Sequence, residues 1–271
     1  MWKTDVTDLT PAARQLLEQY SGIPPSDVLP HALALRDKAW DIAPYGCIGL
    51  LGFTSPSIQN HPHYAYILSH LKSVPGTTLL DLGCGFGQNL RQLALDGVPT
   101  SALSGADLSP SLIKCGYEYF RDQDTLQATF ITHDVLNPAD EFSKNAQGTF
   151  DIVWAALFFH LWGWDQQLEA SVAASKLLKP VPGSVLVGWQ IGATPAREVI
   201  RQSKDSGSEL KWVMYQHDEA SLTKMWEEVG RRTGTRWKVQ AWYDVPSWLK
   251  DAPTFGGEGV GRTTFAIERL E

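Results

Sequence analysis

Cysteine and methionine are scarce in this chain of 271 residues, which has three of each, and its net charge is negative. Cys47, Cys84 and Cys115 form no CxxC pair and no Cys/His ladder, which disfavours a structural zinc site or a disulfide framework. Lysine and arginine number 23 against 30 acidic residues, for a formal charge of -7. This balance disfavours a nucleic-acid-binding module and a polybasic membrane anchor. We therefore expect no metal, no nucleic acid and no membrane among the partners.

Long hydrophobic runs are also missing. The longest, Ile152 to Trp162, is interrupted by His160 and is far shorter than the roughly 20 residues that a membrane helix needs. The N-terminal sequence MWKTDVTDLTPAARQ is polar and acidic, unlike a signal peptide. With 43% hydrophobic and 20% charged residues, the composition is that of a globular protein. We expect a reduced, cytoplasmic protein with one or two domains at roughly 150 residues each.

The first 75 residues read as helical. Thr10-Pro11 is a helix start, because a capping hydroxyl precedes a proline at the first helical position. Apolar spacing predicts further helices, one from Ser26 and one over Asn60 to Val74, with an aromatic loop between them. We interpret residues 1–75 as a helical N-terminal cap that forms one compact unit with a main domain over residues 76–271.

Strands and helices alternate after Gly76. The expected strands lie at 77–82, 101–106, 127–132, 150–157 and 184–191, and the helices at 88–96, 109–120 and 165–178. Elements of these lengths in this order indicate an α/β fold, in which helices cover both faces of a parallel sheet.

The C-terminal part has a different pattern. A helix is expected at 219–229, followed by strands at 237–245 and 263–267 that a Gly/Pro-rich link, 253–261, joins as an antiparallel hairpin at one sheet edge. The polar segment 192–212 interrupts the alternation, and we expect either a lid or a flexible insertion there.

The most informative stretch is LLDLGCGFGQN, in which a buried strand leads into Gly83, Gly85 and Gly87 and then into a helix. Glycine lets the main chain turn sharply and lets a ligand approach it, and the helix start offers free N–H groups. The dinucleotide fingerprint GxGxxG is not met, because its last glycine is replaced by Gln88. Asp81 beside the loop suits an ammonium group better than a pyrophosphate.

Two further acids follow at strand ends. Asp107, in the sequence GADLS, comes about 20 residues after the loop, where a carboxylate accepts ribose hydroxyls. Asp134, in the sequence HDV, follows the next strand, where an adenine amino group would be met. Together these residues indicate a ligand with an adenosine group, a cationic amine and no phosphates, and S-adenosylmethionine fits this description. The predicted cofactor residues are Asp81, Gly83, Gly85, Gly87, Asp107, Leu108, Asp134 and Val135.

These motifs, together with FDIVWAALFFHL, resemble those of class I S-adenosylmethionine-dependent methyltransferases, over roughly residues 79 to 161. The sequences PYGCIG (44–49) and FFHLWGWDQQL are similar to methyltransferases of fungal meroterpenoid and polyketide clusters, several of which esterify a carboxyl group. In that group the loop tends to read Tyr-Pro-Cys-Ile-Gly, whereas this chain has Gly46 in place of the proline. The resemblance implies a Rossmann-like, mostly parallel seven-stranded sheet with an antiparallel last strand.

The acceptor side is less defined. His160 follows the fourth strand and is the candidate catalytic residue, either as a base or as a substrate contact; the alternative is a packed histidine. A carboxylic acid, with a pKa near about 4, needs no base, whereas a phenol near about 10 does. Aromatic side chains would line an apolar acceptor site. The candidate substrate residues are Tyr45, His61, Trp162, Trp189 and Gln190.

We therefore predict O-methylation of a small molecule, with a carboxyl group of a polyketide–terpenoid intermediate as the favoured acceptor. The fourth strand lacks the Asn-Pro-Pro-aromatic end that the resemblance associates with nitrogen acceptors. The alternatives are an enzyme that binds the cofactor but catalyses cyclisation or isomerisation, a nicotinamide oxidoreductase, and a non-catalytic binding module. The oligomeric state is left open.

Overall fold

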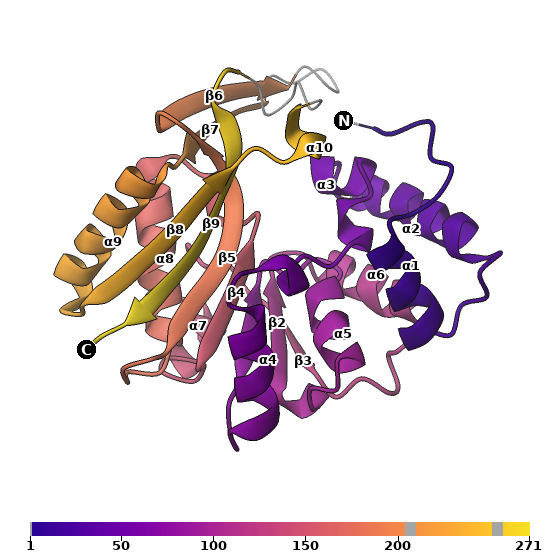
Figure 1. Cartoon of the computed structure of the whole chain (residues 1–271), viewed down its shortest axis with the longest axis horizontal. Coiled ribbons are helices and arrows are strands. Elements are labelled where there is room, and N and C mark those ends of the chain that lie inside the picture. Colours follow the sequence, from indigo (N-terminus) through magenta and orange to yellow (C-terminus); the bar gives the residue numbers. More distant parts are fainter. Residues whose placement is uncertain (1, 204–209, 251–256) are drawn as a thin grey trace. The chain divides into compact units, whose positions relative to one another are not determined.

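The computed structural model describes residues 2–203, 210–250 and 257–271, and the chain divides into two units, Met1–His133 and Asp134–Glu271 (Figure 1). The domain boundary expected at residue 75 differs from this division and stays a prediction. Among the described residues, no helix has the length and apolar character that crossing a membrane requires.

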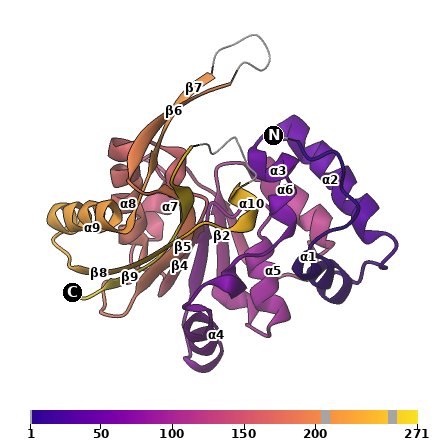
Figure 2. The same ribbon diagram turned by 45° about the horizontal axis from the view of Figure 1, so that its top comes forward.

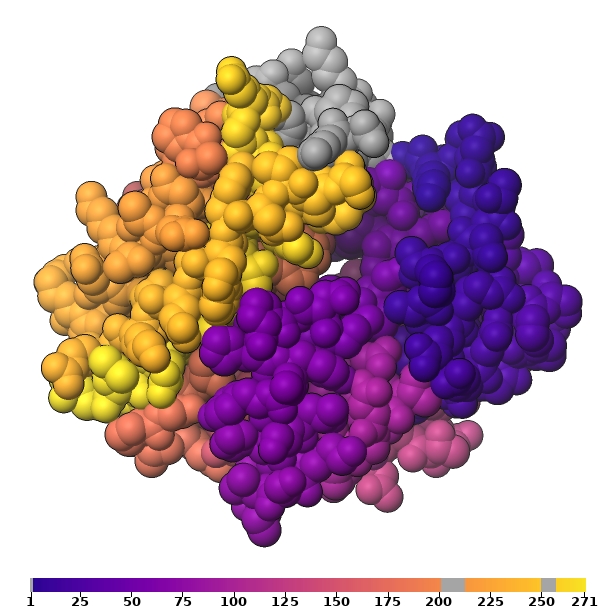
Figure 3. All heavy atoms as spheres, viewed as in Figure 1, coloured from indigo at the N-terminus to yellow at the C-terminus, as the bar shows by residue number. Residues whose placement is uncertain are grey.

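Helices form the N-terminal part of the first unit. Thr10 caps the first of them, because its hydroxyl accepts a hydrogen bond from the Ala13 N–H at 3.2 Å. The helical elements are α1 (Pro11–Gln15), a π-helical turn η1 (Leu16–Tyr20), α2 (Val28–Ile42), α3 (Gly46–Gly49), the 3₁₀ turns η2 (Gly52–Thr54) and η3 (Ile58–Asn60), and α4 (Tyr64–Ser73). The predicted helix positions are confirmed, and α4 lies on the outside of the unit (Figure 3).

Three parallel strands complete the first unit. β1 (Leu79–Leu82) pairs with β2 (Leu103–Asp107), and β2 pairs with β3 (Thr129–Thr132). The helices α5 (Gln88–Leu95) and α6 (Pro110–Phe120) connect them, with the short η4 (Thr100–Ala102) before β2. All four residues of β1 are buried, as expected for a strand covered on both faces.

The second unit holds the remaining strands. β4 (Ile152–Ala156) pairs in parallel with β5 (Val185–Ala193), and β9 (Val260–Arg269) runs antiparallel to both β5 and β8 (Trp237–Asp244). The other elements are α7 (Glu141–Asn145), η5 (Phe159–Leu161), α8 (Trp164–Leu177), α9 (Glu219–Thr233) and α10 (Ser247–Lys250). Among the described residues the strands of the main sheet have the order β3-β2-β1-β4-β5-β9-β8, and β9, the last strand in the chain, runs antiparallel to both of its neighbours. The predicted fold class is confirmed.

The polar segment 192–212 contains regular structure instead of a simple interruption. β6 (Arg197–Ser203) and β7 (Leu210–Gln216) pair as a two-stranded antiparallel sheet that extends away from the other strands of its unit (Figure 2). A lid or a flexible insertion was expected over 192–212, and residues 204–209 of that segment lie outside the described residues, as do residues 253–256 of the Gly/Pro-rich link. The sequence did not predict this hairpin, because its strands carry mixed polar and apolar residues on neither a clear helical nor a clear strand period.

Candidate active site

The glycine loop joins β1 to α5 in the first unit. Gly83, Gly85 and Gly87 all have positive φ, at 77°, 53° and 71°. The N–H groups of Gly83 and Cys84 both donate to the Ala106 carbonyl of β2, at 2.8 and 3.1 Å. Residues with a side chain rarely adopt this backbone, so the loop requires glycine at these turns.

The surroundings of the glycines differ. A Cβ on Gly85 would meet no atom within 4 Å among the described residues, so the main chain there is open to a ligand. A Cβ on Gly87 would lie 2.5 Å from Nη1 of Arg91 and 2.9 Å from the Phe130 ring. Gly87 is therefore required by packing behind the loop, whereas Gly85 leaves room in front of it.

Asp107 lies at the end of β2 and contacts the loop directly. One carboxylate oxygen accepts the Gly85 N–H at 2.8 Å, and the other accepts the Ser109 N–H at 2.9 Å. Burial raises the pKa of Asp107, and these two backbone hydrogen bonds oppose the rise. Each oxygen keeps a second lone-pair direction, so the group can accept two more hydroxyl donors. The neighbouring Leu108 is 65% exposed, so an apolar surface lies next to this acceptor pair.

Asp81 on β1 is a buried carboxyl group, 2% exposed, and its Oδ2 has no hydrogen-bond partner among the described residues. Burial raises its pKa to about 7, the Asn89 side chain lowers it, and the negative charge of Asp107 raises it further. An uncompensated buried carboxylate is costly, and a cation beside it removes that cost. The site is thus prepared for a positively charged ligand.

Asn89 is a site residue that the sequence reasoning missed. Its Oδ1 accepts the N–H groups of Ser57 and Ile58 at 2.9 and 3.2 Å, and its side chain also hydrogen-bonds to Asp81. Its place two positions after the last glycine, in the first turn of α5, was the available signal, but the two N–H groups that its Oδ1 accepts belong to residues 32 and 31 positions earlier in the chain.

Tyr45 and His61, both predicted to contact substrate, lie in the first unit as well. Tyr45 is 56% exposed; partial burial and the nearby Asp107 charge raise the pKa of its hydroxyl. His61 is 5% exposed, and its Nδ1 accepts the His63 N–H at 3.1 Å. Tyr45 thus lies beside the predicted ribose contact, while His61 is largely covered.

The third acid belongs to the second unit. Asp134 follows β3, and its carboxylate accepts the Leu136 N–H at 3.0 Å, which fixes the turn in which it lies. Val135 is 7% exposed. The first unit therefore contains the predicted cofactor residues Asp81, Gly83, Gly85, Gly87, Asp107 and Leu108, and the second begins with Asp134 and Val135.

His160 lies in η5, directly after β4, and is 5% exposed. Burial lowers its pKa to about 4, so the imidazole is neutral at neutral pH. Its Nδ1 has no partner among the described residues. The following turn is fixed, because the Trp162 carbonyl accepts hydrogen bonds from Gln167 Nε2 and the Tyr215 N–H, both at 2.8 Å.

Trp189 and Gln190 are adjacent on β5 and differ in environment. The Trp189 ring is partly exposed and packs edge-on against Trp248 with centroids 6.1 Å apart. Gln190 is 1% exposed and lines an internal cavity of about 10 Å³ within the second unit. Neither polar atom of its amide has a partner among the described residues, and a cavity of this size holds about one water molecule.

Comparisons with known proteins agree with this architecture. Residues 1–54 match a family model described as the meroterpenoid methyltransferase N-terminal domain, and residues 80–184 match a methyltransferase domain model. O-methyltransferase atr3 of Stereocaulon alpinum is 39% identical over 267 residues, which cover 97% of this chain and 74% of that protein. The asnovolin E/chermesin D methyltransferase nvfJ of Aspergillus novofumigatus is 37% identical over 257 residues, covering 95% and 88%.

Solved structures show the same fold at low sequence identity. Haemonchus contortus phosphoethanolamine N-methyltransferase 2 superposes with a TM-score of 0.55 at 16% identity, covering 88% of this chain and 61% of that chain. The structure of DhpI in complex with S-adenosylhomocysteine gives a TM-score of 0.50 at 15% identity, covering 88% and 95%.

The fold and the matched methyltransferase domain define the class: this chain is an S-adenosylmethionine-dependent methyltransferase. More narrowly, it belongs to the family of fungal methyltransferases that includes O-methyltransferase atr3 and the asnovolin E/chermesin D methyltransferase nvfJ, and its first 54 residues match the meroterpenoid methyltransferase N-terminal domain. The resemblance and the cofactor predicted from the sequence are confirmed, and the oxidoreductase and binding-module alternatives are set aside.

Proposed function

We propose that this methyltransferase esterifies a carboxyl group of a polyketide–terpenoid intermediate. The observation that carries the proposal is the buried His160, whose pKa of about 4 makes it a weak base. A group of this basicity cannot efficiently remove the proton of a phenol, whose pKa is near about 10. A carboxylic acid arrives ionised at neutral pH and requires no base. The neutral imidazole is suited instead to a hydrogen bond with the acceptor.

The cofactor is assigned to the glycine loop and the acids around it. The unpartnered Oδ2 of Asp81 would hold the amino group, and the open main chain at Gly85 would contact the amino acid moiety together with Gly83. Asp107 would accept the two ribose hydroxyls beside Leu108, while Asp134 and Val135 would contact the adenine. Gly87 supports the loop from behind. The donor supplies a methyl carbon that its sulfonium group makes electrophilic.

The protein's remaining tasks are alignment and exclusion of water. A carboxylate nucleophile must be held within about 3 Å of the methyl carbon and in line with the bond that breaks, and no proton moves in that step. Tyr45, Trp162 and Trp189 are the aromatic side chains that we assign to an apolar acceptor. The small-molecule partner and the cytoplasmic location remain predictions.

Incubation with methyl-labelled cofactor tests the acceptor class. A matched panel would contain one polycyclic carboxylic acid, the corresponding primary alcohol and a phenol of similar size. We expect label in the acid only, in a product that gains the mass of one CH₂ and releases labelled methanol in dilute alkali. Label stable to alkali would identify an ether and contradict the proposal. A product of unchanged mass would instead support the cyclisation or isomerisation alternative.

Two substitutions of His160 test its role. With the acid as substrate, His160→Phe is expected to lower kcat about 10- to 100-fold, whereas His160→Gln keeps a hydrogen-bond donor and retains most of the rate. At saturating cofactor, wild-type kcat should show no inflection near pH 6.5, because the buried imidazole is neutral down to about pH 4. Equal loss in both variants, or an inflection near pH 6.5 that disappears in them, would identify His160 as a general base.

A further inference from the structure

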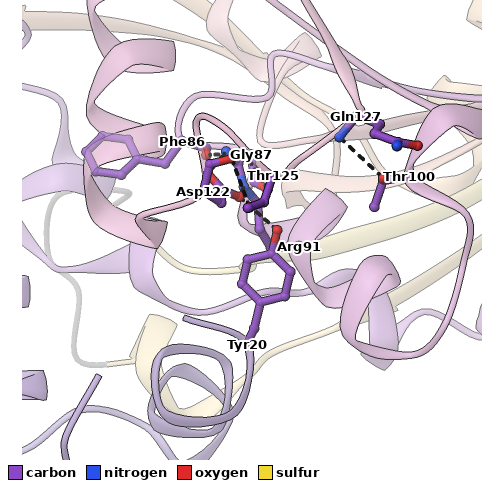
Figure 4. Close-up of polar contacts among 8 residues, drawn as sticks. All are labelled: Tyr20, Phe86, Gly87, Arg91, Thr100, Asp122, Thr125 and Gln127. Atoms are coloured by element: carbon purple, nitrogen blue, oxygen red, sulfur yellow. Dashed lines mark hydrogen bonds and ion pairs between the residues drawn. The ribbon is translucent and has the colours of Figure 1, made fainter. Parts of the chain in front are cut away.

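The glycine loop is held from behind by one buried side chain. Arg91, in the second turn of α5, is fully buried. Its Nη1 donates to the carbonyl of Phe86 at 3.0 Å and to that of Gly87 at 3.4 Å (Figure 4). Each carbonyl shares a rigid peptide plane with the next N–H, so fixing these two oxygens also fixes the N–H groups of Gly87 and Gln88. Arg91 thereby sets the main chain where the loop enters the helix.

Asp122 neutralises Arg91 in a two-pronged ion pair. Arg91 Nε lies 2.8 Å from Asp122 Oδ2, and Nη2 lies 3.0 Å from Oδ1. Asp122 is 3% exposed. Three aromatic rings surround the guanidinium, with centroids 4.8 to 5.3 Å from its carbon: Tyr117, Phe120 and Phe130. A buried pair of this kind depends on every hydrogen bond that its oxygens receive.

Tyr20 supplies one of those hydrogen bonds from the N-terminal region. It is the last residue of η1, and its hydroxyl donates to Asp122 Oδ2 at 2.8 Å (Figure 4). Burial and the Asp122 charge raise the pKa of Tyr20, so the hydroxyl is protonated and acts as a donor at neutral pH. Tyr20 lies in the segment that matches the N-terminal domain model, whereas Arg91 and Asp122 lie in the segment that matches the methyltransferase model.

We propose that Tyr20 is a positioning residue for cofactor binding, acting through Asp122 and Arg91 on the Phe86 and Gly87 carbonyls. The N-terminal segment then contributes to the cofactor site in addition to any contact with the acceptor. This inference rests on the assignment of the glycine loop to the cofactor. Loss of the Tyr20 hydroxyl frees Asp122 to shift, Arg91 follows it, and the loop samples orientations that bind the cofactor less well.

Tyr20→Phe tests the inference, with Tyr64→Phe as the matched control. The Tyr64 hydroxyl also donates to a carboxylate, that of Asp96, but at the opposite end of α5 from the loop. Calorimetric titration with S-adenosylhomocysteine should give a dissociation constant raised roughly tenfold in Tyr20→Phe and less than about twofold in Tyr64→Phe. At saturating cofactor, kcat should remain within about twofold of wild type, so that the effect lies in KM for the cofactor.

A second readout keeps the test independent of overall stability. In Tyr20→Phe, the amides of Gln88 and Asn89 should exchange with deuterium faster than in wild type, and in Tyr64→Phe they should not. Equal changes in affinity for both variants, or unchanged affinity in Tyr20→Phe, would overturn the inference. If the wild-type protein bound no S-adenosylhomocysteine, the assignment of the loop itself would fail, which is a distinguishable result.

Discussion

Replacement of Asp107 with alanine is expected to weaken binding of S-adenosylhomocysteine by at least about 100-fold. Two hydrogen bonds from ribose hydroxyls to a carboxylate contribute about 1.5 kcal/mol or more each, and about 3 kcal/mol corresponds to a factor of about 100. In the wild-type protein the Gly85 N–H donates to Asp107 at 2.8 Å. The substitution removes this hydrogen bond as well and so loosens the loop. Calorimetric titration of the purified variant measures the effect.

Two further variants make this result specific. Asp107→Asn keeps an acceptor oxygen, so its affinity should lie between those of wild type and Asp107→Ala. Asp124→Ala removes an exposed carboxylate from the same unit and should leave affinity unchanged. If Asp107→Ala bound the ligand as tightly as Asp124→Ala, the ribose assignment would be wrong.

Cofactor affinity is expected to fall in acid because of Asp81. In the free protein the pKa of this carboxyl group is about 7, and only the ionised form attracts the amino group of the cofactor. Below that pH, binding must first displace a proton, so the dissociation constant rises about tenfold per pH unit. Between pH 7.5 and 5.5 we expect a change of about 25-fold, measured with S-adenosylhomocysteine in buffers of matched ionic strength.

The Asp81→Asn variant provides the control, because it is expected to weaken ligand binding and to stabilise the free protein. Its affinity for S-adenosylhomocysteine should be lower than that of wild type at pH 7.5 and nearly independent of pH. The free variant should be more stable at pH 8, because the raised pKa means that wild type loses stability as pH rises from about 4 to 7. The gain is at most about 4 kcal/mol, from roughly three pKa units. An unchanged pH dependence in Asp81→Asn would show that another group is responsible.

Local sequence patterns were enough to predict the sheet and the glycine loop. Alternating buried strands and helices predict a parallel sheet that helices cover on both faces. The positive φ angles at positions 83, 85 and 87 require glycine there. Asp81 and Asp107 could be placed because the carboxyl ends of parallel strands meet at one edge of a sheet. Each of these features depends on a short segment of the chain, so the residue types within that segment are enough to predict it.

Features that depend on distant contacts could not be predicted. Tyr20 and Asp122 are separated by 102 positions, and neither residue type signals the other. The pKa of His160 is set by its burial in the folded chain, so the sequence left its role as a base open. Gln190 lies inside β5, three residues before the strand ends, and its side chain lines an internal cavity. A short apolar strand does not reveal which face such a side chain takes.

The most direct test of the cofactor assignment is a crystal structure of the protein co-crystallised with S-adenosylhomocysteine. We expect both ribose hydroxyls within hydrogen-bond distance of the Asp107 carboxylate, the amino group at Asp81 Oδ2, and the ligand's amino acid moiety against the main chain at Gly85. Ligand density elsewhere in the molecule, or a ribose with no contact to Asp107, would contradict the assignment.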